Sequence, residues 1–297
     1  MRANALRKST VNWDSYNTKA EQLLKTHANK EEVFQLLGSI FADIGDFHGA
    51  FFCNGERYGM KQPELKVRQE LQDGFRVGAK VNCMILDELF GYIFIPSVNA
   101  FADDGGLSIG VEIDSIICNT SQTLKGWIID LRLNLGGNMY PMIGGLQSLL
   151  GEGKIGSFVH ENQESIDWII SNGVFKAGVD SVRIAKNLCD FKSLPTVVLI
   201  SQLTSSSGEA VAIAFKGREN TIFIGEPTSG YITALNRYHI TNRAMLLVPE
   251  SHMCDRKGVC YTENVKPDII SVHGDRFVEL EKDAKILQAL SWLNQHK

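Results

Sequence analysis

The spacing of apolar residues changes near residue 78 of this chain. Before that point, residues 13–45 place apolar side chains three or four positions apart, which predicts two helices, the second beginning near Lys30. After it, short apolar runs alternate with longer segments of helical spacing, and this alternation predicts a largely parallel sheet covered by helices. We therefore expect an N-terminal helical region over 1–75 and an α/β core over 76–297.

The apolar pattern also gives the approximate bounds of the elements in the core. The expected strands are 81–86, 91–96, 126–131, 196–201 and 221–225, followed by a hairpin of 234–240 and 244–249. The expected helices are 108–123, 138–150, 208–216 and 275–294. In open sheets of this kind, ligands and catalytic groups lie where the carboxyl ends of strands meet the starts of helices.

Composition excludes several classes of protein. With 297 residues, 44% of them hydrophobic and 22% charged, the chain is close to the globular average and unlike disordered, collagen-like or coiled-coil proteins. A net charge of −4, spread along the chain, gives no footprint of nucleic-acid or membrane-surface binding. The apolar runs are far shorter than the roughly 20 residues of a membrane span, and the basic N-terminus has no apolar segment behind it, so no signal peptide is expected.

The six cysteines form no C-x-x-C pair and no Cys/His cluster with zinc spacing, so we expect no metal site built on them. Free thiols are the default expectation. Cys254 and Cys260 flank a short loop and are the one pair expected to join in an oxidising compartment.

Two strand-to-helix turns carry candidate chemistry. In the first, Gly136 and Gly137 precede a helix, where small residues and the helix dipole suit an oxyanion hole, although an ordinary glycine-rich loop has the same pattern. In the second, three consecutive serines, residues 205–207, precede an alanine-rich helix. A serine there is a candidate nucleophile, and a simple helix cap is the alternative.

Four motifs occur together and in order: Gly-Tyr-Ile-x-Ile-Pro at 91–96, Asp-Leu-Arg-x-Asn-x-Gly-Gly at 130–137, Gly-Glu-Pro-Thr-Ser-Gly at 225–230 and Glu-Asn-Val-Lys-Pro-Asp-Ile at 263–269. With them the chain resembles the C-terminal processing peptidase (tail-specific protease) family of serine peptidases over about 35–297. The resemblance implies a ClpP/crotonase-like α/β core and hydrolysis of peptide or protein substrates without a cofactor.

The resemblance also assigns the residues of the second and first turns. The family nucleophile lies three residues before a helix glutamate, and Glu209 therefore selects Ser206. Ser207 would supply one oxyanion N–H, and the pair Gly136 and Gly137 would supply the other.

The general base follows from how the chain departs from one branch of the family. That branch places a lysine where this chain has Tyr231, so a Ser/Lys dyad is not expected. The branch that resembles the tricorn protease core uses a histidine and a glutamate, whose counterparts are His48 and Glu263. The serine that precedes the histidine in tricorn is Phe47 here, which suggests a Ser206–His48–Glu263 set.

The resemblance leaves several alternatives open. The stretch between His48 and Gly91 is about half of what a PDZ module requires, so no such module is expected. An inactive relative that binds an apolar ligand, a peptide-binding scaffold with a decayed site and an acyl-CoA enzyme are the competing functions. Most relatives are exported, which implies the periplasm or cell surface with a leader absent from this chain; the cytoplasm is the alternative.

Overall fold

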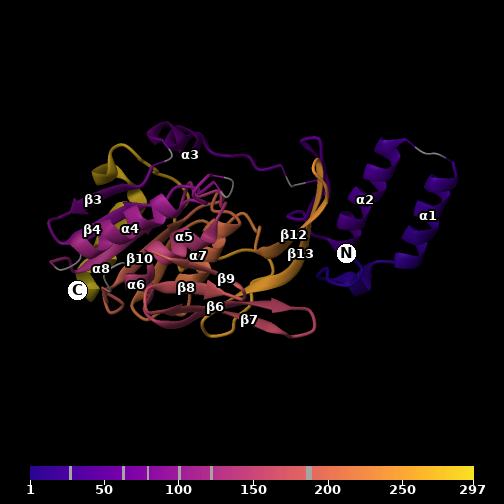
Figure 1. The fold of residues 1–297 in the computed structure, drawn as a ribbon. Coiled ribbons are helices and arrows are strands. Elements are labelled where there is room, and N and C mark those ends of the chain that lie inside the picture. The colour runs from indigo at the N-terminus through magenta and orange to yellow at the C-terminus, as the bar shows by residue number, and fades with distance from the viewer. Residues whose placement is uncertain (27–28, 62–63, 79, 100–101, 121–122, 185–188) are drawn as a thin grey trace. The chain divides into compact units, whose positions relative to one another are not determined.

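The structure, a computed structural model, describes residues 1–297 except 27–28, 62–63, 79, 100–101, 121–122 and 185–188 (Figure 1). The chain forms two compact units. The first comprises Met1–Leu65, Val159–Glu164 and Thr233–His252, and the second comprises Lys66–Phe158, Ser165–Ile232 and Met253–Lys297. This partition differs from the expected boundary after residue 75, because the first unit ends its leading segment at Leu65 and includes two later segments.

The first unit begins with the two helices that the apolar spacing predicts, α1 (Trp13–Lys25) and α2 (Lys30–Ile44). A capping box starts α2: Asn29 Oδ1 accepts the N–H of Glu32, and the Glu32 carboxylate accepts the N–H of Asn29. Gly45 ends the helix with φ 70°, a left-handed conformation that glycine adopts without steric cost. Local capping signals therefore fix both ends of α2.

Four strands complete the first unit. In this unit β13 (Ala244–Asp255) pairs antiparallel with β12 (Thr233–Thr241) on one side and with β1 (Ala50–Cys53) on the other, and β2 (Glu56–Tyr58) pairs with β1. The last three residues of β13, 253–255, belong to the second unit. Ile40, Phe41 and Ile44 of α2 supply much of the unit's buried apolar core. The β12–β13 hairpin agrees with the expected one, whereas β1 and β2 were not expected.

The second unit contains a six-stranded sheet in the order β14-β11-β10-β5-β4-β3. All neighbours pair parallel except β3 with β4, so the expectation of a largely parallel sheet is confirmed. The strands are β3 (Asn82–Leu86), β4 (Phe90–Phe94), β5 (Gly126–Asp130), β10 (Thr196–Ile200), β11 (Thr221–Gly225) and β14 (Ile269–Ile270).

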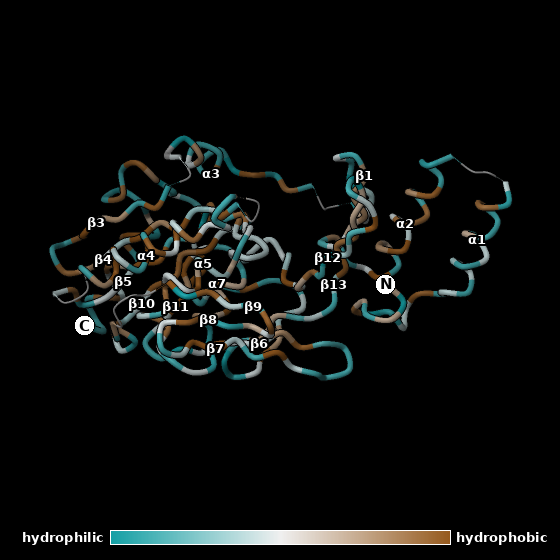
Figure 2. Tube along the Cα trace, viewed as in Figure 1, coloured by the Kyte–Doolittle hydropathy of each residue, from teal (hydrophilic) through white to brown (hydrophobic). Residues whose placement is uncertain are grey.

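Helices cover both faces of this sheet. Trp127 and Ile129 of β5 face α4 (Leu107–Thr120), α5 (Met139–Gly145), α6 (Gln147–Leu150) and α7 (Ser207–Phe215), whereas Ile128 faces α3 (Gln69–Gly74) and α8 (Ala284–His296). Figure 2 shows the brown apolar positions gathered inside this unit and the teal polar ones in its loops. Burial on both faces explains why β4, β5 and β10 are buried throughout.

Three helices differ from their expected bounds. The helix expected at 138–150 is interrupted at Leu146, and the one expected at 108–123 ends at Thr120, with residues 121–122 outside the described residues. The helix expected at 275–294 begins later, at Ala284, because Asp283 caps it by accepting the N–H groups of Lys285 and Ile286.

A group of strands between residues 153 and 183 was not expected from the sequence: β6 (Gly153–His160), β7 (Ser165–Ser171), β8 (Val174–Ala177) and β9 (Asp180–Arg183). The pairs β7–β8 and β8–β9 are antiparallel hairpins. Asn172 and Gly173, both with positive φ, form the turn between β7 and β8. An Asn-Gly pair between apolar runs is a strong hairpin signal, so this part of the fold was readable from the sequence.

Two disulfides join Cys118 to Cys189 and Cys254 to Cys260, while Cys53 and Cys83 are free thiols. The default expectation of free thiols is therefore wrong for four of the six cysteines. Cys254 and Cys260 pair across a short antiparallel bridge, the geometry anticipated for a hairpin loop. The pairing of Cys118 with Cys189 spans 71 residues and left no local signal.

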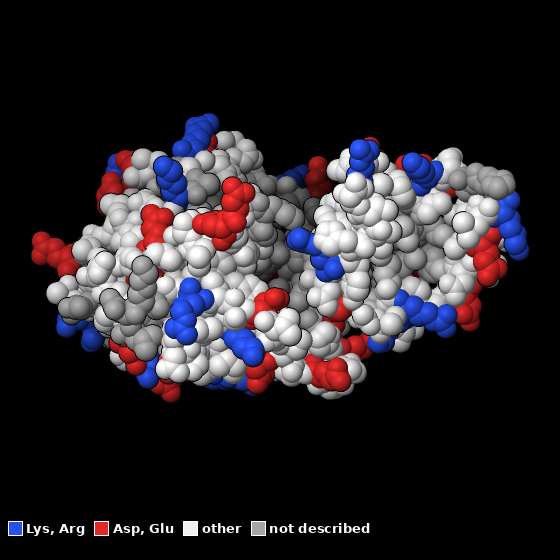
Figure 3. All heavy atoms as spheres, viewed as in Figure 1, with Lys and Arg blue, Asp and Glu red and all other residues white. Residues whose placement is uncertain are grey.

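Among the described residues, none of the helices is long and apolar enough to cross a bilayer. The face drawn in Figure 3 intersperses Lys and Arg with Asp and Glu.

Candidate active site

Ser206 lies in the turn between β10 and α7, at the N-cap of the helix. Its backbone adopts φ 52° and ψ −116°, a conformation that non-glycine residues rarely take and that clusters at functional sites. The side chain is half-buried. A serine on a strained strand-to-helix turn is the arrangement that exposes a nucleophile close to a helix N-terminus.

The turn is fixed by backbone contacts with the neighbouring strand-to-helix turn. The Ser205 N–H donates to the Asn134 carbonyl at 2.9 Å, and the Gly208 N–H donates back to the Ser205 carbonyl at 2.8 Å. The Thr204 hydroxyl donates to the Leu131 carbonyl at 2.9 Å. The two turns that the sequence singled out are therefore hydrogen-bonded to each other.

The glycine pair packs directly against the serine turn. A Cβ added to Gly136 would lie 2.9 Å from the Ser206 Cβ, and one added to Gly137 would lie 1.8 Å from the Val98 carbonyl oxygen. Both glycines have strongly positive φ, 100° and 112°. Only glycine fits at these two positions, which explains the close approach of this loop to Ser206.

The backbone N–H groups of the site divide into engaged and available donors. The Gly136 N–H donates to Asn134 Oδ1 at 2.9 Å, so it is used within its own loop. The N–H groups of Gly137 and Ser207 have no hydrogen-bond acceptor among the described residues. The Ser207 hydroxyl donates to the Gly137 carbonyl at 2.9 Å and ties these two residues together. Gly137 and Ser207 are thus the N–H donors that this geometry leaves for an oxyanion.

His48 belongs to the first unit and lies two residues before β1. Its Nδ1 lies 2.9 Å from the Thr233 carbonyl oxygen. Because a carbonyl oxygen only accepts, Nδ1 carries the proton and the lone pair of the neutral ring is on Nε2. Burial lowers the pKa of His48 to about 4, although Asp46 and the Thr233 carbonyl act in the opposite direction. The ring is therefore neutral at pH 7, as a general base must be.

Asp46 holds the surroundings of His48 in place. Asp46 Oδ1 accepts the N–H groups of His48 and Gly49, each at 2.8 Å, and Oδ2 accepts the Thr233 hydroxyl at 3.0 Å. A carboxylate that accepts the N–H groups two and three residues ahead is a recognisable local turn, so Asp46 was within reach of sequence reasoning. Thr233 lies 185 residues from His48 and gave no such signal.

Glu263 belongs to the second unit and follows the loop closed by the Cys254–Cys260 disulfide. Its side chain is exposed, and it forms no hydrogen bond or ion pair within the described part of the chain. It lines an open surface pocket together with Lys216, Tyr261 and Asn264. The structure thus gathers Ser206, Ser207, Gly136 and Gly137 into one place, and shows Glu263 on an exposed segment.

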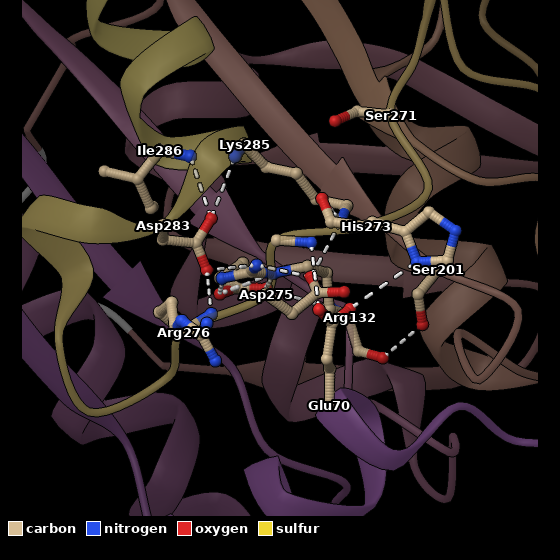
Figure 4. A network of polar contacts seen from close by, with 12 residues as sticks. Glu70, Arg132, Ser201, Ser271, His273, Asp275, Arg276, Asp283, Lys285 and Ile286 are labelled. Atoms are coloured by element: carbon tan, nitrogen blue, oxygen red, sulfur yellow. Dashed lines mark hydrogen bonds and ion pairs between the residues drawn. The ribbon is translucent and has the colours of Figure 1, made fainter.

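A buried charge network supports both strand-to-helix turns (Figure 4). The Arg132 guanidinium, fully buried, pairs with Asp130, with Asp275 at 2.8 Å and with Asp283 at 2.7 Å, and Lys285 pairs with Asp275 at 2.9 Å. Burial alone would raise the pKa of Asp275, but the charges of Arg132 and Lys285 hold it below its usual value. The Arg132 carbonyl accepts the Ser201 hydroxyl, which links the network to the segment leading to Ser206.

Replacing Arg132 tests this support. Arg132→Met should lower the free energy of unfolding by about 3–5 kcal/mol, because it leaves three carboxylates buried without their main partner. Urea unfolding followed by circular dichroism measures the change. The exposed pair of Arg76 with Asp73 provides the control, since Arg76→Met should change stability by no more than about 0.5 kcal/mol. Equal effects of the two substitutions would contradict a supporting role of the network.

Within the described ranges, no group of three or more His, Cys, Asp and Glu side chains could hold a metal ion. The described residues offer a serine on a strained turn and two backbone N–H donors in the second unit, and a neutral imidazole in the first.

Residues 90–271 match the family model described as "Peptidase family S41". Among curated proteins, a nisin-resistance protein of Lactococcus lactis subsp. lactis is 34% identical over 146 residues, which are 49% of this chain and 46% of that protein. The aligned part thus spans about half the length of that relative.

Solved structures share the fold. A lipoprotein of Streptococcus agalactiae has a TM-score of 0.76 at 21% identity, covering 100% of this chain and 93% of the other. A photosystem II D1 C-terminal processing protease has a TM-score of 0.56 at 14% identity, covering 91% of this chain and 90% of the other. These likenesses confirm the expected fold class.

Proposed function

Because the chain belongs to peptidase family S41, we propose that it is a serine peptidase that hydrolyses peptides or unfolded segments through an acyl-enzyme on Ser206. The single observation that carries the proposal is the backbone of Ser206, strained at φ 52° and ψ −116° at the start of α7. Strain of this kind persists only where the surrounding structure enforces it, and here the glycine loop and the buried network do so.

In the proposed mechanism His48 Nε2 accepts the proton of the Ser206 hydroxyl as the oxygen attacks the substrate carbonyl carbon. The N–H groups of Gly137 and Ser207 stabilise the oxyanion that develops, and the dipole of α7 adds to this stabilisation. His48 then donates the proton to the leaving amine. In the second half of the reaction His48 accepts a proton from water as the water oxygen attacks the acyl carbon, and it returns that proton to the Ser206 oxygen as the acyl group leaves. Gly136 shapes the loop rather than donating, since its N–H is engaged by Asn134.

We propose that the Thr233 carbonyl, supported by Asp46, orients the His48 ring. The family resemblance assigns that role to Glu263 instead. The two assignments predict different effects on kcat for substitutions of Asp46 and of Glu263. Asp46→Asn keeps Oδ1 for the two N–H groups but turns the acceptor of the Thr233 hydroxyl into a donor. We expect kcat to fall by about 10²-fold, the loss that a displacement of about 1 Å causes.

Glu263→Gln is the matched comparison, since it makes the same change of carboxylate to amide on an exposed segment. With Thr233 and Asp46 as the orienting groups, kcat should stay within about 3-fold of the parent value. A loss of about 10²–10³-fold for Glu263→Gln, with Asp46→Asn near the parent, would assign the orienting role to Glu263.

The relatives and the cysteines support a proposal on the compartment and the substrate class. The relatives include a nisin-resistance protein and a lipoprotein, and two disulfides are typical of oxidising compartments, so we propose an extracytoplasmic peptidase. The name of the first relative makes the peptide nisin a reasonable first substrate to try, beside a fluorescent casein. C-terminal processing, as in the D1 protease, is tested by mass spectrometry of the products.

A fluorophosphonate probe tests the central proposal. It should label the full chain on the peptide that contains Ser206, and labelled protein should no longer hydrolyse casein. A chain that folds, binds peptide and remains unlabelled would instead be the inactive, ligand-binding relative.

A further inference from the structure

The carboxylate of Glu209 is completely buried in the second unit, three residues after Ser206, and forms no ion pair within the described part of the chain. Oε1 accepts the Thr228 hydroxyl at 2.5 Å and the Gly230 N–H at 2.9 Å, and Oε2 accepts the Ser206 N–H at 2.8 Å. We propose that Glu209 is a positioning residue, whose ionised carboxylate holds the Ser206 turn in register with the segment 228–231. This inference rests on the proposed peptidase function.

Every group that faces this carboxylate is a donor to it, which explains why a carboxylate is needed there. A carboxylate accepts with both oxygens, whereas a glutamine in the same place accepts with one and donates with the other. A glutamine would therefore leave the Ser206 N–H without its acceptor, or leave Gly230 without its own. The backbone of Ser206 is strained at φ 52° and must be held in place by its contacts. The hydrogen bond from its N–H to Glu209 is one of these contacts.

The contacts of Glu209 reach the other candidate residues along the chain. The Thr228 hydroxyl accepts the Val265 N–H at 2.8 Å, two residues beyond Glu263. Gly230 lies three residues before Thr233, whose carbonyl holds the His48 ring. One buried carboxylate thus links the nucleophile turn to the chain segments that lead to Glu263 and to the partner of His48.

Ionising Glu209 costs stability in the folded protein. Burial raises the pKa of Glu209 to about 7, against the hydrogen bonds from the Thr228 hydroxyl and from the backbone of Gly230, Ser206 and Tyr231, which lower it. None of the groups that set this pKa is charged. Because the folded pKa lies above the ordinary value of 4.5, the folded state binds more protons between pH 4.5 and 7, and its stability falls as the pH rises through that window.

The proposal is testable because the Glu209 charge should lower the stability of the folded protein while raising its reaction rate. Glu209→Gln removes the buried charge, so its melting temperature at pH 8 should equal or exceed that of the parent. The same substitution displaces the nucleophile turn, so kcat and the rate of fluorophosphonate labelling should fall by about 10²-fold with little change in KM. Glu219→Gln, at an exposed position of the same unit, is the matched control and should leave both rates and the melting temperature unchanged.

The pH dependence of labelling gives a second measurement, in the parent chain and in the variant. The labelling rate of the parent should fall as the pH drops through about 7, where Glu209 takes up its proton. In Glu209→Gln the rate should be low and constant over the same range, because glutamine resembles the protonated carboxyl.

The outcomes separate this inference from the function on which it rests. A parent chain that is not labelled at any pH would overturn the proposed peptidase and this inference with it. A labelled parent with a flat rate between pH 8 and 5, or a Glu209→Gln variant labelled at the parent rate, would overturn the positioning role alone. A loss of labelling that merely follows a lowered melting temperature would show that Glu209 is structural.

Discussion

Ser206→Ala is expected to lower kcat by about 10⁶-fold and to abolish fluorophosphonate labelling, the size of loss seen when the nucleophile of a serine triad is removed. The substitution removes one oxygen from a half-buried side chain and leaves the bonds of the Ser206 N–H and of the glycine loop in place. The free energy of unfolding should therefore change by less than about 1 kcal/mol. Hydrolysis of fluorescent casein and urea unfolding of the same preparation measure the two quantities.

The neighbouring serine is the control for this prediction. Ser207 lies in the same turn, but its hydroxyl donates to the Gly137 carbonyl and is therefore engaged in holding the oxyanion loop. Ser207→Ala should keep labelling and lower kcat only modestly, by about 10-fold or less, through a looser loop. Full labelling of Ser206→Ala together with its loss in Ser207→Ala would move the nucleophile by one residue.

The parts of the fold that the sequence predicted are those with strong local signals. The central strands β5 and β10 have continuous apolar runs, with a polar residue only at one end of each, because helices cover both faces of their sheet. The serine turn and the glycine pair were found because each follows such a strand directly. Their closeness in space followed from the geometry of parallel sheets, in which strand ends meet at one edge.

The parts that the sequence did not predict depend on contacts between distant residues. The helix expected from residue 275 begins at Ala284, after its cap Asp283, and Asp275 lies before it, paired with the buried charges of Arg132 and Lys285. Nothing near Asp275 in the sequence announces those partners. The same holds for the hydrogen bond between His48 and the Thr233 carbonyl. The acceptor is a backbone group, so the residue type at position 233 gives no sign of it.

Glu209 combines a local sequence signal with contacts that depend on the fold. Its place in the family motif selected Ser206 as the candidate nucleophile, yet its contacts with Thr228 and Gly230, which lie 19 and 21 residues away, appear only in the folded structure. A buried carboxylate that accepts the N–H of Ser206 lowers the stability of the folded protein when it is ionised. Residues that lower stability in this way are expected at functional sites. Sequence patterns select a candidate reactive group, and the structure shows which residues contact it.

His48→Ala is expected to lower kcat by about 10⁶-fold as well, because a serine hydroxyl without a base is a poor nucleophile and triad members act as a unit. His160→Ala is the matched control, since His160 is also half-buried in the first unit with Nδ1 3.0 Å from a backbone carbonyl, that of Glu250. It should keep the parent kcat. Activity that survives His48→Ala would assign the base to another group, such as a lysine.

The pH dependence distinguishes His48 from an ordinary imidazole. Since burial lowers its pKa to about 4, His48 stays neutral well below 6.5, and it should limit kcat/KM only as the pH falls through about 4. In the parent this limb comes second, after a first limb near pH 7 where the protonation of Glu209 lowers the rate. Glu209→Gln should therefore expose a single acid limb near pH 4 in its low residual activity. A limb near 6.5 in that variant would mean that the ring of His48 is more accessible to water during catalysis than its burial and its bond to Thr233 require.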